Sequence, residues 1–151
     1  MKKTKDSNEY YHSQKDYISS SAIKTIAKKS VLHFMEQKPL KSDALTIGSA
    51  FHTYVLENEL FFNEFMISQK INRRTKAGKE EYAKLLAQAQ ATGKQLINEL
   101  DYRMIQTMSE KIFEDETCKK LLSDGEPEVS FYCENFLEVK VRVRPDYYKE
   151  G

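Results

Sequence analysis

Apolar residues recur at helical spacing through most of the chain. This pattern predicts helices over residues 18–38 and 42–58, and a long helical region after residue 79 that is interrupted near Gly93. The second half of that region, residues 97–113, carries Ile97, Leu100, Met104, Met108 and Ile112 at near-helical spacing. We expect the stripe of Met104, Met108 and Ile112 to belong to the core. A shorter helix is predicted over residues 116–125.

Capping and breaking residues define two of these helices more closely. Ser19 or Ser20 is suited to cap the first helix, and Ser42 or Asp43 the second, because short polar side chains accept the unpaired N–H groups there. Pro39 is expected to end the first helical segment, since proline cannot continue a helix.

The pattern changes to a period of two near the end of the chain. Val129, Phe131 and Cys133 alternate with polar residues, and so do the apolar residues from Leu137 to Val143. With a turn at Glu134–Asn135, this predicts an antiparallel hairpin with one buried face. A short apolar run at 64–68 predicts one more strand. The fold class expected is α+β: N-terminal helices followed by an antiparallel β-hairpin.

Composition is that of a globular protein, with 40% apolar and 31% charged residues in 151. We expect a flexible, polar arm over residues 1–17 and one domain over 18–151. No apolar run is long enough to span a membrane and no signal peptide is evident, so the expected location is the cytoplasm. Cys118 and Cys133 lack the spacing of zinc, disulfide or iron–sulfur sites. The net charge of +1 requires any contact with nucleic acid to come from a local cluster.

Two residues are candidates for metal chemistry. Asp146 follows Pro145 at the end of the last predicted strand, and a carboxylate there is rigidly aimed. It is a candidate ligand of Mg²⁺ or Mn²⁺, or else the start of a turn that balances Arg142 and Arg144. His52 shares a helical face with Gly48 and is either a ligand or a histidine satisfied in the core. Gly48 costs about 1 kcal/mol relative to alanine, so we expect it to admit a neighbouring backbone or a substrate.

A basic segment lies between these two residues. It contains no acidic residue, and it predicts either a grip on the phosphate backbone of DNA or a solvated loop. Its candidate DNA-binding residues are Lys70, Arg73, Arg74, Lys76 and Lys79.

From Tyr17 onward the chain resembles RecE-type exonucleases (exonuclease VIII) of the PD-(D/E)XK nuclease superfamily. The resemblance rests on the order of "ALTIGSAFHTYVLEN", "RRTKAGKEEY" and "EVSFYCENFLEVKVRVRPDYY". It implies that His52 and Asp146 are catalytic and bind the metal, with Glu128 as a secondary candidate that is otherwise a solvated carboxylate. In that family a further strand carries an acidic-x-Lys unit, and "YYKEG" after Asp146 contains none. We therefore expect the N-terminal part of a nuclease core, inactive alone.

The resemblance also implies a function and partners. A complete enzyme of this type is a metal-dependent exodeoxyribonuclease that acts on double-stranded DNA in phage-type recombination. Its expected partners are duplex DNA, a single-strand annealing recombinase and further copies of itself. Two alternatives remain: a non-catalytic DNA-binding or regulatory fragment, and a small α+β interaction module whose likeness to nucleases is coincidental.

Overall fold

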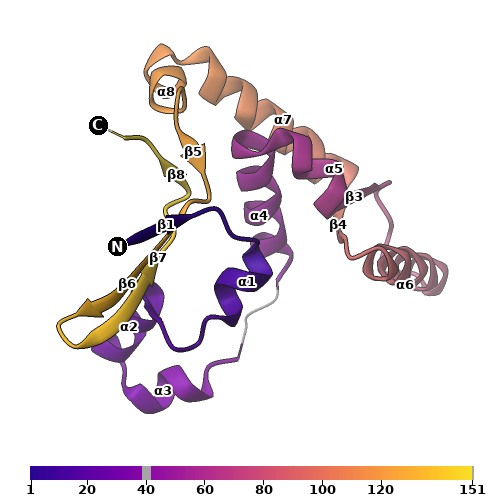
Figure 1. The fold of residues 1–151 in the computed structure, drawn as a ribbon. Helices are drawn as coiled ribbons and strands as arrows, with labels where there is room; N and C mark the ends of the chain where they lie inside the picture. Colours follow the sequence, from indigo (N-terminus) through magenta and orange to yellow (C-terminus); the bar gives the residue numbers. More distant parts are fainter. Residues whose placement is uncertain (39–41, 151) are drawn as a thin grey trace. The chain divides into compact units, whose positions relative to one another are not determined.

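A computed structural model describes residues 1–38 and 42–150 of the chain. Its contacts divide it into two compact units, and the chain is coloured by residue number in Figure 1. Unit 1 comprises residues 1–40 and 124–151, and unit 2 comprises residues 41–123. Helices and an antiparallel hairpin are both present, so the predicted α+β class is confirmed. Pro39, expected to end the first helical segment, lies outside the described residues.

Unit 1 is built around a four-stranded sheet in the order β1-β6-β7-β2. Strands β1 and β6 and strands β6 and β7 are antiparallel, whereas β2 runs parallel to β7. A second, two-stranded sheet pairs β5 with β8. The elements of this unit are β1 (Lys2–Thr4), α1 (Asn8–Ser13), β2 (Ile18–Ser19), α2 (Ser20–Lys28), α3 (Val31–Glu36), β5 (Glu126–Pro127), β6 (Ser130–Phe136), β7 (Val139–Val143) and β8 (Tyr147–Tyr148).

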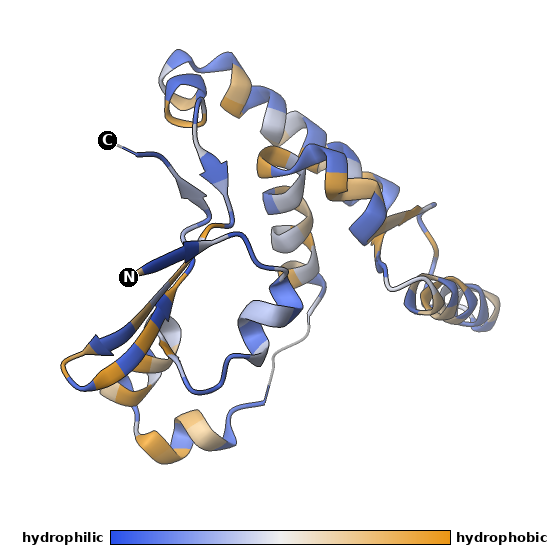
Figure 2. Cartoon of the chain, in the orientation of Figure 1, coloured by the Kyte–Doolittle hydropathy of each residue, from blue (hydrophilic) through white to orange (hydrophobic). Residues whose placement is uncertain are grey.

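The hairpin of β6 and β7 is present, but its turn is not where the sequence placed it. The two strands meet at Leu137 and Glu138, whose φ angles are 51° and 66°, and not at Glu134–Asn135. Asn135 acts one step earlier, because its side-chain oxygen accepts the N–H of Glu138 at 3.0 Å. Figure 2 shows the expected alternation of polar and apolar residues along both strands. The buried residues of the hairpin lie at the end of β6 that pairs with β1, and no residue of β7 is buried. Phe131 and its neighbour Tyr132 are both buried although they point to opposite faces, so the hairpin does not have the single buried face that was expected.

Unit 2 packs helices around a short parallel pair of strands, β3 and β4. Its buried core contains Phe61, Phe65 and Ile105 among others, and Phe61 stacks on Phe65 with ring centroids 5.2 Å apart. The strand predicted at 64–68 is confirmed. The elements are α4 (Asp43–Leu56), η1 (Asn58–Leu60), α5 (Phe61–Glu64), β3 (Phe65–Ser68), α6 (Lys76–Ala91), β4 (Gln95–Asn98), α7 (Glu99–Glu114) and α8 (Glu116–Leu121).

Two of the predicted helix starts are confirmed by their capping bonds. The hydroxyl of Ser19 accepts the N–H of Ala22, and the hydroxyl of Ser42 accepts the N–H of Leu45, each at 3.2 Å. The first helical segment is two helices, α2 and α3, separated by a new cap at Ser30. The arm predicted over 1–17 and the domain predicted over 18–151 stay predictions, although β1 and α1 give part of the arm regular structure.

The long helical region differs from its prediction in two ways. Ile97 lies in strand β4, and α7 begins only after it, capped by Asn98. The methionine stripe is not core: Met104 and Met108 are 44% and 42% exposed, whereas Ile105 is fully buried. Gly48 is not explained by a close neighbour, since a Cβ there would meet no atom within 4 Å. Among the described residues, no helix combines the length and apolar character needed to cross a bilayer.

Candidate functional site

Asp146 and Glu128 meet in unit 1 because of strand register. Strands β5 and β8 pair Glu126 with Tyr148 and Pro127 with Tyr147, and the next pair in that register is Glu128 with Asp146. The N–H of Glu128 donates to the carbonyl of Asp146 at 3.2 Å, which continues the ladder by one step. A carboxylate oxygen of each residue lies within 4.8 Å of the other. The strand tip expected to carry Asp146 therefore presents two carboxylates.

The backbone of Glu128 has an unfavourable conformation. Its φ of 55° is in the left-handed region, which residues other than glycine, asparagine and aspartate rarely occupy. Such a conformation costs on the order of 1–3 kcal/mol and persists only where surrounding contacts enforce it. Here the ladder bond to Asp146 and the contacts of the side chain enforce it. The Glu128 carboxylate is consequently aimed, and only 25% of its side chain is exposed.

Arg144 holds that carboxylate from within unit 1. Its Nη1 lies 3.4 Å from Glu128 Oε2, and its side chain is only 6% exposed. Nε donates to the fully buried Ser130 hydroxyl at 2.9 Å, and Nη2 donates to the carbonyls of Asp6 and Ser7 at 3.3 and 3.2 Å. Nearly every donor of this guanidinium is engaged, so its position is fixed.

The N-terminal helix α1 packs against the same arginines. The guanidinium carbon of Arg144 lies 4.1 Å from the centroid of the Tyr11 ring, and that of Arg142 lies 4.6 Å from it. Arg142 also donates to the Tyr11 carbonyl. Burial, followed by the positive charges of Arg142 and Arg144, holds the pKa of His12 below its ordinary value. Residues of α1 thus belong to the immediate surroundings of the acidic pair.

Gly125 and Tyr147 pack closely together next to the acidic pair. Gly125 N–H donates to the Tyr147 hydroxyl at 2.9 Å, and a Cβ on Gly125 would come within 2.4 Å of the Tyr147 ring. No side chain larger than hydrogen fits there without moving Tyr147. Because Tyr147 follows Asp146 directly, this close approach helps to set the course of the chain at the candidate ligand.

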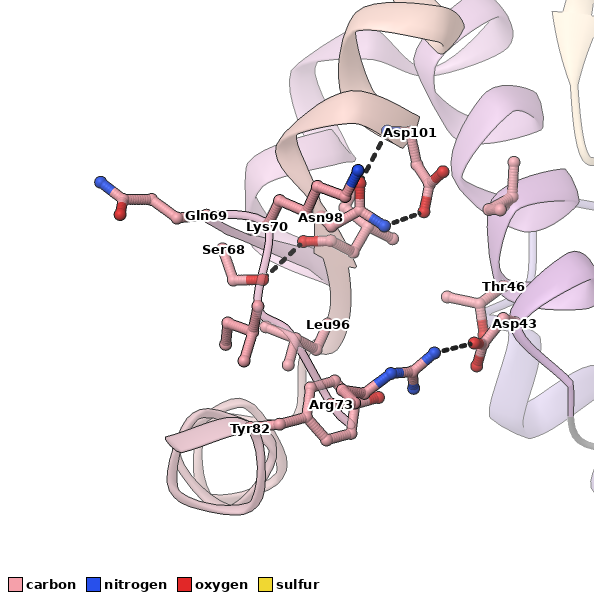
Figure 3. Close-up of a pocket in the computed structure, with 13 residues that line it drawn as sticks. Asp43, Thr46, Ser68, Gln69, Lys70, Arg73, Tyr82, Leu96, Asn98 and Asp101 are labelled. Atoms are coloured by element: carbon pink, nitrogen blue, oxygen red, sulfur yellow. Dashed lines mark hydrogen bonds and ion pairs between the residues drawn. The ribbon is translucent and has the colours of Figure 1, made fainter. Parts of the chain in front are cut away.

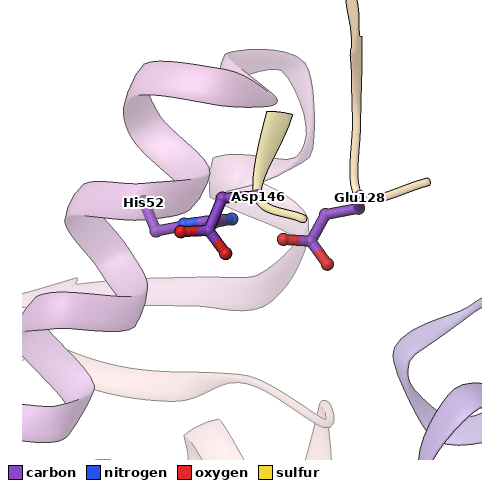
Figure 4. Close-up of side chains that lie close together, drawn as sticks. All are labelled: His52, Glu128 and Asp146. Carbon is purple, nitrogen blue, oxygen red and sulfur yellow. The ribbon is translucent and has the colours of Figure 1, made fainter. Parts of the chain in front are cut away.

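Figure 4 draws the two carboxylates together with His52, the third candidate ligand. His52 is half-buried on α4 and belongs to unit 2. Asp146 and Glu128 belong to unit 1, so the pairing of His52 with them stays a prediction. Within unit 1, Glu128 and Asp146 offer two hard oxygen donors, and Arg144 pairs with Glu128. That donor set fits Mg²⁺ or Mn²⁺, which prefer carboxylate oxygens.

An acidic-x-Lys unit does occur earlier in the chain, as Glu138–Val139–Lys140. It does not join the acidic pair. Glu138 lies in the hairpin turn, and Lys140 pairs with Glu134 at 3.0 Å at the end of the hairpin remote from Asp146. Glu138–Val139–Lys140 has the spacing of an acidic-x-Lys unit, but it lies too far from the acidic pair to act with it.

The basic segment lies in unit 2, in the loop after β3 and the first turn of α6. Arg73 is engaged with Asp43 at 2.9 Å, and this bond raises the pKa of its guanidinium above the ordinary value. The other four candidates are exposed: Lys70, Arg74, Lys76 and Lys79. Lys76 and Lys79 lie in the first turn of a helix, where the helix dipole disfavours cations by about 0.3–1 kcal/mol each.

Gly78 is what brings this loop close to α6. A Cβ at Gly78 would come within 2.1 Å of the Asn72 carbonyl, and its N–H donates to the capping hydroxyl of Thr75 at 3.0 Å. Gly78 was not among the residues predicted to matter. Its signal was present, because a glycine in the first turn of a helix is costly and needs a packing reason.

Comparison with known proteins adds one finding. A family model described as a PDDEXK-like domain of unknown function (DUF3799) matches residues 13–151. The matched span contains Glu128 and Asp146 in unit 1 and His52 and the basic segment in unit 2. Searches of curated proteins and of solved structures gave no match.

Proposed function

Because the chain belongs to the family of PDDEXK-like domains of unknown function (DUF3799), we propose that it carries the metal-binding residues of a nuclease active site. Membership supports the PD-(D/E)XK superfamily expected from the sequence, and with it a nuclease-type hydrolase that binds DNA. Nucleases of this superfamily generally depend on a divalent metal. The finer assignment is a RecE-type exodeoxyribonuclease that acts on double-stranded DNA.

The observation that carries the proposal is the paired geometry of Glu128 and Asp146. Two carboxylates within 4.8 Å repel one another unless a cation lies between them. Arg144 offsets one of the two negative charges, and the second charge is left for a metal ion to balance. We assign Asp146 and Glu128 as ligands of Mg²⁺ or Mn²⁺ and His52 as a third ligand from α4. The metal ion, when bound, would act as a Lewis acid that activates water and stabilises the departing oxygen.

The residues of the chain have distinct tasks in this assignment. Asp146 and Glu128 hold the ion at a fixed strand tip, and Arg144 prevents Glu128 from turning away. The basic residues neutralise backbone phosphates, which gives affinity without sequence preference. Lys76 and Lys79 lower the stability of α6 at its first turn, and this supports a role for them other than stabilising the helix. The proposal includes a cytoplasmic location. The RecE resemblance implies a single-strand annealing recombinase as partner and assembly into homo-oligomers.

Metal binding by the 151-residue chain tests the proposal. We expect one Mn²⁺ per chain in titration calorimetry, weakened at least tenfold by Asp146→Asn and by Glu128→Gln, and also by His52→Gln if α4 contributes a ligand. Asp124→Asn is the matched control, because Asp124 is an exposed carboxylate of unit 1 outside the pair. Equal Mn²⁺ affinity in Asp146→Asn and the wild type would refute the metal site.

We expect the chain to bind metal without cleaving DNA. The acidic-x-Lys unit Glu138–Val139–Lys140 does not join the acidic pair, and a nuclease site without a general base loses on the order of 10²–10⁴ in rate. We therefore expect no Mg²⁺-dependent digestion of linear duplex DNA by the 151-residue chain alone. The same observation favours, as second candidate function, binding of DNA and metal without hydrolysis. Digestion that survives Asp146→Ala would place the active site elsewhere.

A further inference from the structure

Unit 2 contains a cavity of about 220 Å³ at the carboxyl ends of its parallel strands. Ser68 ends β3, Asn98 ends β4, and the two residues are register partners, so both strands stop at the same edge. In open α/β sheets ligands bind at this edge. The cavity is closed by the start of α4, by the loop after β3 and by Tyr82 of α6, as Figure 3 shows.

One wall of the cavity is flat. The guanidinium carbon of Arg73 lies 4.7 Å from the centroid of the Tyr82 ring, and Asp43 fixes the far side of that guanidinium at 2.9 Å. The apolar part of the lining comes from Ile47 and Leu96. Tyrosine rings and guanidinium planes are surfaces on which nucleobases stack. A planar ligand therefore finds both a stacking surface and an apolar edge here.

The charges in the lining balance. Asp43 and Asp101 face Lys70 and Arg73, so neither a bare anion nor a bare cation is favoured. Asp101 accepts from the Asn98 amide at 2.5 Å through one oxygen, and its second oxygen accepts no hydrogen bond from the described residues. Among those residues Lys70 likewise has no hydrogen-bond partner. An acceptor and a donor are thus available to a neutral ligand that carries both kinds of group.

The volume of the cavity limits the size of the ligand. At about 30 Å³ per water molecule the cavity holds roughly seven waters. That volume suits a single nucleobase, and it is too small for a base pair. A nucleobase is planar, neutral, and edged by donors and acceptors, which are the three properties that the lining selects.

We propose that this cavity binds one unpaired nucleobase of a DNA strand. Lys70 and Arg73 belong both to the cavity and to the basic segment, and Arg74, Lys76 and Lys79 continue that segment along the loop and the first turn of α6. Phosphates flanking the base contact these cations while the base enters the cavity. The inference rests on the proposed function only in taking DNA as the ligand, and it requires neither metal nor hydrolysis.

The test compares two DNA probes in EDTA by fluorescence anisotropy. Both are the same labelled duplex with a short single-stranded overhang, and in one probe every overhang nucleotide is abasic. The probes have equal phosphates, so only base contacts distinguish them. We expect the probe with bases to bind the wild-type chain about 5- to 150-fold more tightly, the range that stacking of one base provides.

Variants separate the base contact from phosphate contacts. Tyr82→Leu should abolish the preference for bases, and Tyr82→Phe, which keeps the ring, should retain it. Lys79→Gln is the matched control: it should weaken both probes equally and leave the preference unchanged, because Lys79 does not line the cavity. Circular dichroism establishes that each variant is folded.

Three results would overturn the inference while leaving DNA binding itself intact. Equal affinity of the wild type for both probes would show that no base is bound. A preference unaffected by Tyr82→Leu would place the base elsewhere. Binding of free deoxyadenosine as tight as that of the overhang would make the cavity a nucleoside site independent of DNA. Failure to bind either probe would instead refute the proposed DNA contact itself, together with the inference, whereas Mn²⁺ binding would be untouched.

Discussion

Arg144 is the residue whose loss should damage unit 1 most. Its guanidinium pairs with Glu128 at 3.4 Å with side chains 6% and 25% exposed, and it is the donor to the buried Ser130 hydroxyl. Removing one partner of a buried ion pair typically costs about 3–5 kcal/mol, because the remaining charge is left uncompensated. We expect Arg144→Met to lower the free energy of unfolding of unit 1 by ~3 kcal/mol, a large part of the total for a small domain.

A double-mutant cycle separates the ion pair from the other contacts of Arg144. Glu128→Gln removes the charge with which Arg144 pairs, so the double variant should be more stable than the sum of the single effects predicts. Contacting residues of this kind show coupling of about 0.5–3 kcal/mol, and we expect ~2 kcal/mol here. The remainder of the loss reports the Ser130 bond and the stacking on Tyr11.

Urea unfolding followed by circular dichroism gives the free energies, and hydrogen exchange of β6 and β7 amides assigns them to unit 1. Arg103→Met is the matched control, since Arg103 makes an exposed pair with Glu99, and such pairs contribute about 0–1 kcal/mol. A loss below about 1 kcal/mol for Arg144→Met, comparable to the control, would contradict the reasoning. Zero coupling with Glu128→Gln would show that Arg144 does not hold that carboxylate.

Two further predictions concern other parts of the chain. Gly78→Ala should destabilise unit 2 by about 1–3 kcal/mol in urea unfolding, because the added Cβ meets the Asn72 carbonyl at 2.1 Å and displaces the basic loop; a neutral effect would mean that the loop moves freely. His12 should make unit 1 less stable as the pH falls below about 6.5, since its lowered pKa means that the unfolded chain takes up the proton more readily. The drop in melting temperature from pH 7.5 to 5.5 should shrink in His12→Asn and persist in His33→Asn, and an identical drop in both variants would exclude His12 as its source.

Local signals predicted the helices well because the forces behind them are local. Ser19 and Ser42 cap their helices through bonds that span three residues, so the sequence alone reveals them. Strand β4 was missed, since Ile97 fits a helical and a strand pattern equally and its pairing with Ile67 of β3 is distant in sequence. The parallel pair, and the cavity at its edge, could not be foreseen without that pairing.

Periodicity also failed to identify the buried face of α7. Leu100, Met104 and Met108 form a regular stripe, yet Ile105 is the apolar residue that the core of unit 2 encloses. Apolar residues lie on more than one side of this helix. A helical period then predicts that a helix forms, whereas the choice of face depends on which neighbours it packs against.

The position of one turn decides where Glu128 lies relative to Asp146. Asparagine favours turns, so Glu134–Asn135 was taken as the corner, and that register places Glu128 far from Asp146. Asn135 instead accepts a hydrogen bond from Glu138, and the chain reverses at Leu137 and Glu138. With the corner moved, the register of Phe131 with Val143 extends to bring Glu128 opposite Asp146. A shift of two to three residues in a hairpin therefore decides whether one carboxylate or two stand at the strand tip, and hence whether unit 1 by itself offers a metal ion enough oxygen ligands.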